Sequence, residues 1–152
     1  MGLTHGLILT TGKAGAAVGP NSDDMLSYYK YDELVSTDSY KVLLENYTGG
    51  KEVFAYCVFS FDVIPQGDTI SYDYMFTSEE YNELVDSHYN DAFAFFISGP
   101  GIVPDTNAGG RRNIARIPNS NVEVSINTVN NGNSNDLYPT GPCMNCACFE
   151  NK

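Results

Sequence analysis

The sequence has no tryptophan, two histidines and few basic residues. Lys and Arg together number 8 against 19 Asp and Glu, so the 152-residue chain carries a formal charge of −11. A protein that binds nucleic acid needs a basic stripe to neutralise phosphates. The only basic cluster here is the pair Arg111-Arg112, and we therefore expect no nucleic-acid partner. The acidic excess has two interpretations, a well-solvated surface or the binding of a hard cation through carboxylate oxygens.

Long apolar runs are also missing. The longest is AFAFFI at 92–97, which has the length of a strand rather than the roughly 20 residues of a membrane span. We therefore expect no transmembrane segment. Residues 1–15 lack both the basic n-region and the long apolar h-region of a signal peptide. The chain is accordingly either cytosolic or an exported protein whose signal has been removed.

Two motifs are typical of exported proteins. The four cysteines are an even number, which fits two disulfides with three alternative pairings. Three of them lie in the tail CMNCACF at 143–149, whose C-x-x-C spacing also fits a zinc site, and free thiols are a third alternative. The triplet NYT at 46–48 makes Asn46 a candidate glycosylation site. The disulfide candidates are Cys57, Cys143, Cys146 and Cys148.

The remaining composition favours strands joined by tight turns. Aromatic residues make up 12% of the chain, and there are 14 Gly and 7 Pro. Residues 51–64 carry apolar side chains on both alternating faces for part of their length, which predicts a strand covered on both sides. Residues 69–77 alternate as well, and the turn PQGD at 65–68 predicts that the two segments form a β-hairpin. Further strands are predicted at 5–12, 91–98, 113–118 and 122–130.

One helix and a single domain complete the predicted architecture. Thr77 and Glu80 have the T-x-x-E spacing of a capping box, which predicts a short helix at 78–87. The whole chain, 1–152, is predicted to form one domain in which 131–152 is an irregular Cys-rich tail. Several short strands with turns between them predict an all-β fold, of the β-sandwich or jelly-roll type, with one short helix.

Acidic and amide side chains gather near the ends of two predicted strands. Glu79 and Glu80 follow one strand, and Asn90 and Asp91 stand where the next strand begins. Calcium takes about 6–8 oxygen ligands, so this set suits a calcium site in which the cation offsets the repulsion between the carboxylates. The alternative is structural, with Glu80 capping the helix and Asp91 capping a turn.

Three sequence blocks, taken in order, resemble a known family. They are SEEY at 78–81, NDAFAFFISGPG at 90–101 and NIARIP at 113–118. Together with GLILTTG at 6–12 and VSINTVN at 124–130, they are similar to the choice-of-anchor L domain. The resemblance implies a β-rich extracellular module in secreted and surface proteins of bacteria. It implies no catalytic activity.

The chain also departs from the family pattern at both ends. Family members usually continue past the block at 124–130 into further strands, and they usually begin before the block at 6–12. We therefore expect the central part of such a domain, with an open sheet edge that invites pairing with another chain. A second chain or a neighbouring subunit would supply the missing strands, as in donor-strand complementation. The alternative is a shorter, self-contained domain closed by disulfides in its tail.

These observations favour a non-enzymatic extracellular module for adhesion or assembly at the cell surface. We expect it to be stabilised by calcium and to join a fibre or surface complex through open sheet edges. A carbohydrate-binding module with a glycan ligand is the alternative. A glycan hydrolase is a third hypothesis, in which Glu79 and Glu80 would be the paired carboxylates. The sequence holds no nucleophile elbow, H-E-x-x-H motif or P-loop, and we predict no catalytic residue.

Overall fold

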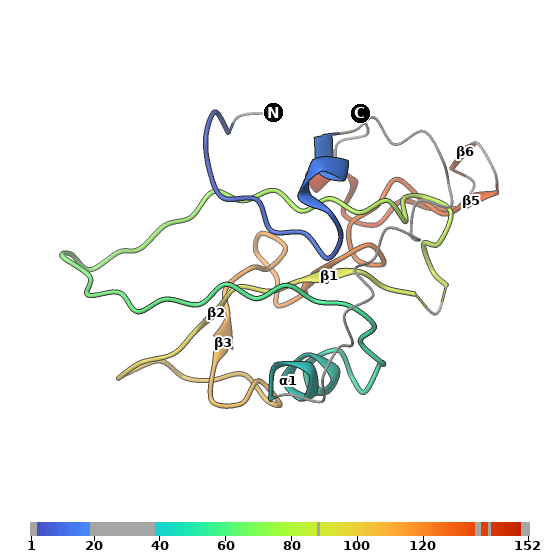
Figure 1. Ribbon diagram of the computed structural model, residues 1–152. Coiled ribbons are helices and arrows are strands. Elements are labelled where there is room, and N and C mark those ends of the chain that lie inside the picture. Colours follow the sequence, from blue (N-terminus) through green and yellow to red (C-terminus); the bar gives the residue numbers. More distant parts are fainter. Residues whose placement is uncertain (1–2, 19–38, 88, 136–137, 140, 150–152) are drawn as a thin grey trace.

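The computed structural model describes residues 3–18, 39–87, 89–135, 138–139 and 141–149 (Figure 1). Its regular structure consists of short antiparallel strand pairs, one α-helix and short 3₁₀ helices. The helical elements are the 3₁₀ helix η1 (Ala14–Val18), the α-helix α1 (Ser39–Tyr47) and the 3₁₀ helix η3 (Cys146–Cys148). The strands are β1 (Ala92–Phe93), β2 (Phe96–Ile97), β3 (Arg112–Asn113), β4 (Val124–Ser125), β5 (Ser134–Asn135) and β6 (Tyr138–Pro139).

Three antiparallel pairs organise these strands. β1 pairs with β4 so that Ala92 lies opposite Ser125, and β2 pairs with β3 so that Phe96 lies opposite Asn113. β5 and β6 form a small hairpin inside the tail that was predicted to be irregular. The strand predicted at 91–98 is thus present as two short pieces with two different partners. The described residues contain these pairs but no closed sandwich or jelly roll.

The packed centre follows an alternating pattern after β3. Asn113, Ala115 and Ile117 are buried, whereas the intervening Ile114 is 42% exposed. Side chains that alternate in this way face opposite sides of an extended backbone, so one side of this segment points into the core. The core cluster comprises Ile117, Val124 and Val129, with Phe76, Phe93 and Phe149 packed against it.

The α-helix lies at 39–47 and not at the predicted position. In α1, Leu43 is buried, Tyr47 meets the ring of Phe96 edge-on at 5.1 Å, and Lys41 and Glu45 form an ion pair at 3.4 Å. Tyr47 packs on β2 and Leu43 lies against Gly109 in the loop before β3, and these contacts stabilise the segment as a helix. Nowhere in the described ranges does a helix combine the length and apolar character that a membrane crossing needs.

The segment at 78–87 forms successive turns instead of the predicted helix. The side chain that accepts the N–H of Glu80 is Ser78 Oγ, at 3.1 Å. The N–H of Leu84 reaches the Glu80 carbonyl at 3.1 Å, but the next bond, from Val85, goes back only three residues to Asn82. A hydrogen bond that spans three residues interrupts the four-residue spacing of an α-helix. The capping motif therefore begins a turn and not a helix.

Residues 51–77, here called the exposed arm, form a long loop whose bend projects away from the strand pairs (Figure 1, green). The chain runs out along 51–64, bends at 66–68 and returns. Neither limb belongs to an assigned strand, so the predicted hairpin between 51–64 and 69–77 is not formed. Every residue from Cys57 to Met75 is exposed. The prediction that 51–64 is covered on both faces is therefore wrong for this chain on its own.

Candidate functional site

The end of the exposed arm meets the start of β1. Tyr74 and Phe76 stack on Phe93, with ring centroids 4.9 and 6.5 Å away. Asp91 directly precedes β1, and its backbone carbonyl accepts the N–H of Ile126 at 3.0 Å. The two strand ends that were predicted to carry the acidic residues therefore lie close together.

A serine hydroxyl connects the two ends. Ser78 Oγ donates to Asp91 Oδ2 at 2.8 Å and accepts the N–H of Glu80 at 3.1 Å. The hydroxyl thus caps the turn and holds the Asp91 carboxylate near Glu80. The charges of Asp91 and Glu79 both act on the Glu80 carboxyl group. We call Glu79, Glu80 and Asp91 the acidic cluster.

Burial and like charge both oppose ionisation in the acidic cluster. Loss of solvent raises the pKa of Glu80 to about 7, and the charges of Asp91 and Glu79 add to that effect. Loss of solvent around the carboxyl group also raises the pKa of Asp91, although the hydrogen bond from Ser78 opposes the change. Asp91 as a whole is an exposed residue, so we expect the larger energetic consequence at the half-buried Glu80.

Tyr81 anchors the turn on its other side. Its hydroxyl donates to the carbonyl of Val129, and its ring meets Phe149 at 4.9 Å. Burial and the charge of Asp91 raise the pKa of Tyr81 to about 12, so the phenol keeps its proton and remains a donor. The acidic cluster therefore rests on a turn that is fixed to both the β4 region and the tail.

Asn90, the fourth predicted cation ligand, has a structural role. Its Oδ1 accepts the N–H of Asn127 at 3.2 Å, and Asn127 Oδ1 in turn accepts the N–H of Asp86 at 2.7 Å. The structure therefore brings together the three predicted carboxylates and directs the amide of Asn90 to the loop after β4.

Sequence reasoning missed two further oxygens in the same turn. Buried oxygens of Glu80, Asn82 and Glu83 have no hydrogen-bond partner. Buried oxygens without partners are costly, and a cation or a donor group would reduce that cost. In the sequence, the only sign that Asn82 and Glu83 belong to this site was their position within three residues of Glu80. Among the residues that the structure describes, no three His, Cys, Asp or Glu side chains are arranged to hold a metal ion.

The cysteines divide into one disulfide and two free thiols. Cys143 and Cys146 are bonded to each other, while Cys57 and Cys148 are free and exposed. One of the two expected disulfides is thus present, and its sulfurs are not available as the thiolates of a zinc site. Asn46 is exposed in the last turn of α1, and its glycosylation stays a prediction.

Comparison with known families matches residues 1–152 to the choice-of-anchor L domain. The chain belongs to the choice-of-anchor L family. No curated protein and no solved structure matches it significantly. Membership confirms the resemblance seen in the sequence and indicates a surface-associated or secreted bacterial module.

Three of the choice-of-anchor L blocks lie in the packed part of the molecule, whereas GLILTTG at 6–12 is largely exposed. NDAFAFFISGPG at 90–101 contains β1 and β2, and NIARIP at 113–118 supplies the alternating buried residues after β3. SEEY at 78–81 carries Ser78, two members of the acidic cluster and the anchoring tyrosine. The blocks that identify this choice-of-anchor L chain therefore also build the junction on which the acidic cluster stands.

Proposed function

We propose that this chain is a non-enzymatic assembly module of the bacterial cell surface, in which copies of the chain complete one another's β-structure. The observation that carries the proposal is the exposed arm. Ten of its apolar side chains are 38–85% exposed, although Tyr72 and Tyr74 also pack on Phe95 and Phe93, and none of its residues belongs to an assigned strand. The apolar side chains are Phe54, Val58, Phe59, Phe61, Val63, Ile64, Ile70, Tyr72, Tyr74 and Met75.

The pattern of the arm indicates what should cover it. Apolar residues on both faces are typical of a strand inside a sheet that is covered from both sides. An extended segment with unpaired N–H and C=O groups is also a template for strand addition. A contiguous apolar surface of this kind marks an interaction site more often than a solvent-facing loop. Strand addition would place the arm in a sheet, as in the β-sandwich that the sequence predicts.

A candidate donor segment lies in the same chain, which favours a second copy as the partner. Residues 6–10, GLILT, were predicted to be a strand, but they have no assigned strand structure. Leu7 is 66% exposed and Ile8 is 60% exposed. The segment carries no charge, so its insertion beside the arm buries no unpaired ion. Each copy thus offers both a donor segment and an acceptor arm.

Calcium at the acidic cluster is part of the proposal. Close carboxylates with raised pKa values, together with the buried oxygens of Glu80, Asn82 and Glu83, support a site for a hard cation. No three acidic side chains in the described ranges form a cage by themselves. The remaining ligands would therefore be amide and backbone oxygens, such as those of the turn at 78–87. A cation at this point would fix the base of the arm.

The assembly is tested by measuring native mass with light scattering over a range of concentrations. We expect the wild type to form oligomers, and we expect Phe59→Lys in the arm and Ile8→Lys in the donor segment to shift the mass towards monomer. Val103→Lys is the matched control, because Val103 is 71% exposed but lies outside both segments. A wild type that stays monomeric at every concentration would refute assembly between copies.

A carbohydrate-binding module is the second candidate, and one observation favours it. Phe59 and Phe61 are exposed neighbours in the arm, with ring centroids 5.4 Å apart. Exposed aromatic rings of this kind offer apolar faces to a ligand. A glycan array separates the two functions, since the assembly proposal predicts no specific glycan signal and the alternative predicts one that Phe59→Ala removes.

A further inference from the structure

Three cysteines lie within six residues of the tail in two chemical states. Cys143 and Cys146 form a disulfide, and Cys148 is a free, exposed thiol two residues further on. In exported proteins, a free thiol beside a disulfide is a candidate for exchange or for pairing between molecules. The tail therefore holds a nucleophile and an electrophile of the same reaction close together.

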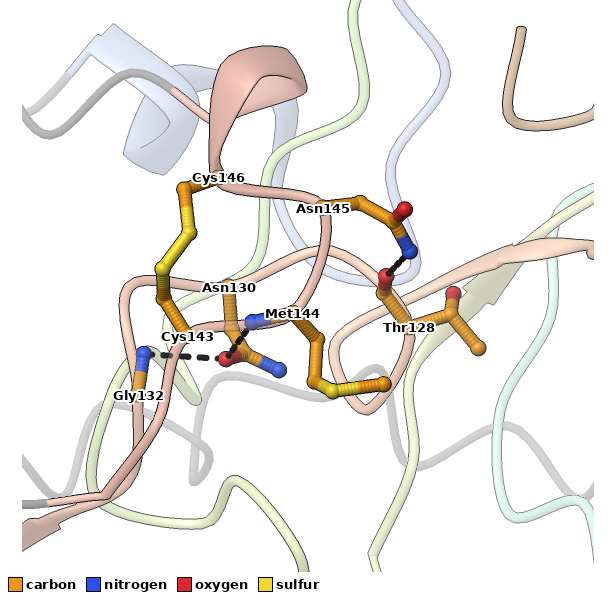
Figure 2. Close-up of a disulfide and its surroundings, with 7 residues drawn as sticks. All are labelled: Thr128, Asn130, Gly132, Cys143, Met144, Asn145 and Cys146. Atoms are coloured by element: carbon orange, nitrogen blue, oxygen red, sulfur yellow. Dashed lines mark hydrogen bonds between the residues drawn. A yellow bond between two sulfur atoms is a disulfide. The ribbon is translucent and has the colours of Figure 1, made fainter. Parts of the chain in front are cut away.

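The tail is held firmly on the body of the molecule (Figure 2). Asn130 is 1% exposed, and its Oδ1 accepts the N–H of Gly132 at 2.9 Å and of Met144 at 3.2 Å. Asn145 Nδ2 donates to the carbonyl of Thr128 at 2.7 Å. These contacts fix the stretch between the two bonded cysteines, so the disulfide has a defined position.

The free thiol is also held in place. The N–H of Cys148 donates to the carbonyl of Asn145 at 2.9 Å, and the N–H of Phe149 donates to that of Cys146 at 3.0 Å. The ring of Phe149 packs on Tyr81 and on the core cluster. Cys148 thus projects from an anchored 3₁₀ helix while its side chain stays exposed.

The two bonded cysteines differ in exposure. Cys143 is an exposed residue, and Cys146 is half-buried. An incoming thiolate approaches a disulfide along the axis of the bond and attacks the more accessible sulfur. The attack should therefore fall on Cys143 and release Cys146. The second free thiol, Cys57, lies on the exposed arm and not in the tail.

We infer that the tail is a covalent cross-linking site between copies of this chain, in which Cys148 of one copy attacks the Cys143–Cys146 disulfide of the next. Cys148 loses its proton, its sulfur forms a new bond to the sulfur of Cys143, and the old bond breaks. The electron pair of that bond leaves with Cys146, which takes up a proton. The number of disulfides is unchanged, so the step needs no external oxidant.

The reaction propagates from copy to copy. The attacked copy still has its own Cys148, which can attack a third copy, so the product is a head-to-tail chain. The inference rests on the proposed function, because copies already held together react faster than copies that must first meet. The disulfide between copies would then stabilise covalently an assembly that forms by non-covalent contacts.

The test is a non-reducing gel of purified protein that is kept free of oxidant and then quenched with a thiol-alkylating reagent. We expect a ladder from the wild type and from Cys57→Ser, and monomer only from Cys148→Ser and Cys143→Ser. Peptide mapping should find Cys148 joined to Cys143. The ladder should form faster at higher pH, because the thiolate is the attacking species.

Three outcomes would overturn the inference. They are an absence of any ladder, a ladder that requires Cys57, and a bond between Cys57 and Cys148 within one chain. Light scattering of Cys148→Ser separates this failure from failure of the proposed function. If that variant still forms oligomers and the wild type shows no ladder, the copies assemble without a covalent link. If the variant is monomeric while the wild type forms a ladder, the link alone joins the copies.

Discussion

Buried asparagine side chains connect segments that are far apart in the sequence. Asn113 is fully buried and uses both ends of its amide. Its Oδ1 accepts the N–H groups of Phe95 and Ala115 at 3.0 and 2.9 Å. Its Nδ2 donates to the Tyr47 hydroxyl at 2.8 Å and to the Ala115 carbonyl at 3.1 Å. One side chain thus joins α1, β3 and the segment between β1 and β2.

Replacement of Asn113 by Ala should be among the most damaging single changes. It leaves two backbone N–H groups and a phenol without partners in the core, so we expect the free energy of unfolding to fall by about 2–4 kcal/mol. Urea denaturation measures the loss. Asn121→Ala is the control, because exposed Asn121 makes one contact, with Arg116 at 2.9 Å, and should cost at most about 0.5 kcal/mol. Equal losses in both variants would contradict the role of Asn113.

The acidic cluster should make stability depend on pH in a defined direction. The pKa of Glu80 is about 7 in the folded chain against an ordinary value of 4.5, so the folded state holds the proton more tightly. Its contribution to stability is present below about pH 4.5 and is lost as the pH rises through about 7. We expect the melting temperature to fall by a few degrees across that range, and Glu80→Gln to flatten the dependence. Glu52→Gln, outside the cluster, should leave it unchanged.

Calcium should act in the opposite sense if it binds the acidic cluster. The ion binds ionised carboxylates, so millimolar calcium should raise the melting temperature at about pH 8 more than at about pH 5. The rise should disappear in Asp91→Asn and remain in Asp68→Asn, whose carboxylate lies in the bend of the arm. An equal rise in both variants would place the ion elsewhere.

For single residues, the sequence could predict which charged side chains lie close together. It could not predict which asparagine amides are hydrogen-bonded within the fold. Glu79, Glu80 and Asp91 were expected together because the sequence predicted them at the ends of neighbouring strands, and they lie close together although 69–77 is not an assigned strand. Asn90 was expected to bind a cation, but a nearby backbone N–H takes its oxygen. The burial of Asn113 depends on Tyr47, which is 66 residues away, and no local pattern reveals such a partner.

At the level of secondary structure, the position of α1 is set by tertiary packing and was not predicted from local sequence signals. The segment at 78–87 has a capping motif but forms turns, whereas 39–47, where no helix was predicted, forms the α-helix. Packing of α1 against the loop before β3 accounts for the difference. A Cβ atom added to Gly109, which has φ of +57°, would lie 3.2 Å from Leu43 Cδ1. The helix therefore fits closely against that loop.

Leu43 should carry most of the stability that α1 contributes. Leu43→Ala removes a side chain that is 8% exposed, so we expect the free energy of unfolding to fall by about 2–3 kcal/mol. Val42→Ala is the matched control, because Val42 is 48% exposed in the same turn and Ala favours a helix. Guanidinium denaturation compares the two. A loss from Val42→Ala as large as that from Leu43→Ala would show that α1 does not pack as described.

The strands were predicted where long-range packing and local pattern agree. The runs at 91–98 and 122–130 contain β1, β2 and β4, and their apolar residues are drawn into one core. The runs at 51–64 and 69–77 have an equally strong pattern but belong to no assigned strand. Alternation predicts that a segment can join a sheet, but it does not say whether the neighbouring strand lies in the same chain.

For the whole molecule, the central feature is the contrast between a packed centre and an apolar arm. Ile126 and Ala108 are fully buried, while Ile64, next to the bend of the arm, is 85% exposed. Such exposure opposes solubility unless another surface covers it, and the net charge of −11 offsets that tendency for single copies. The sequence predicted the family, whereas the location of the exposed apolar arm required the structure.

Hydrogen exchange of residues 57–75, measured by mass spectrometry across a concentration series, tests the account most directly. The variant to use is Cys57→Ser/Cys148→Ser, which removes covalent links. We predict rapid exchange of these amides in dilute monomer and protection that grows as copies associate, because strand addition pairs the backbone of the arm. Protection that is already complete in the monomer would contradict the account, since the arm would then be paired within its own chain.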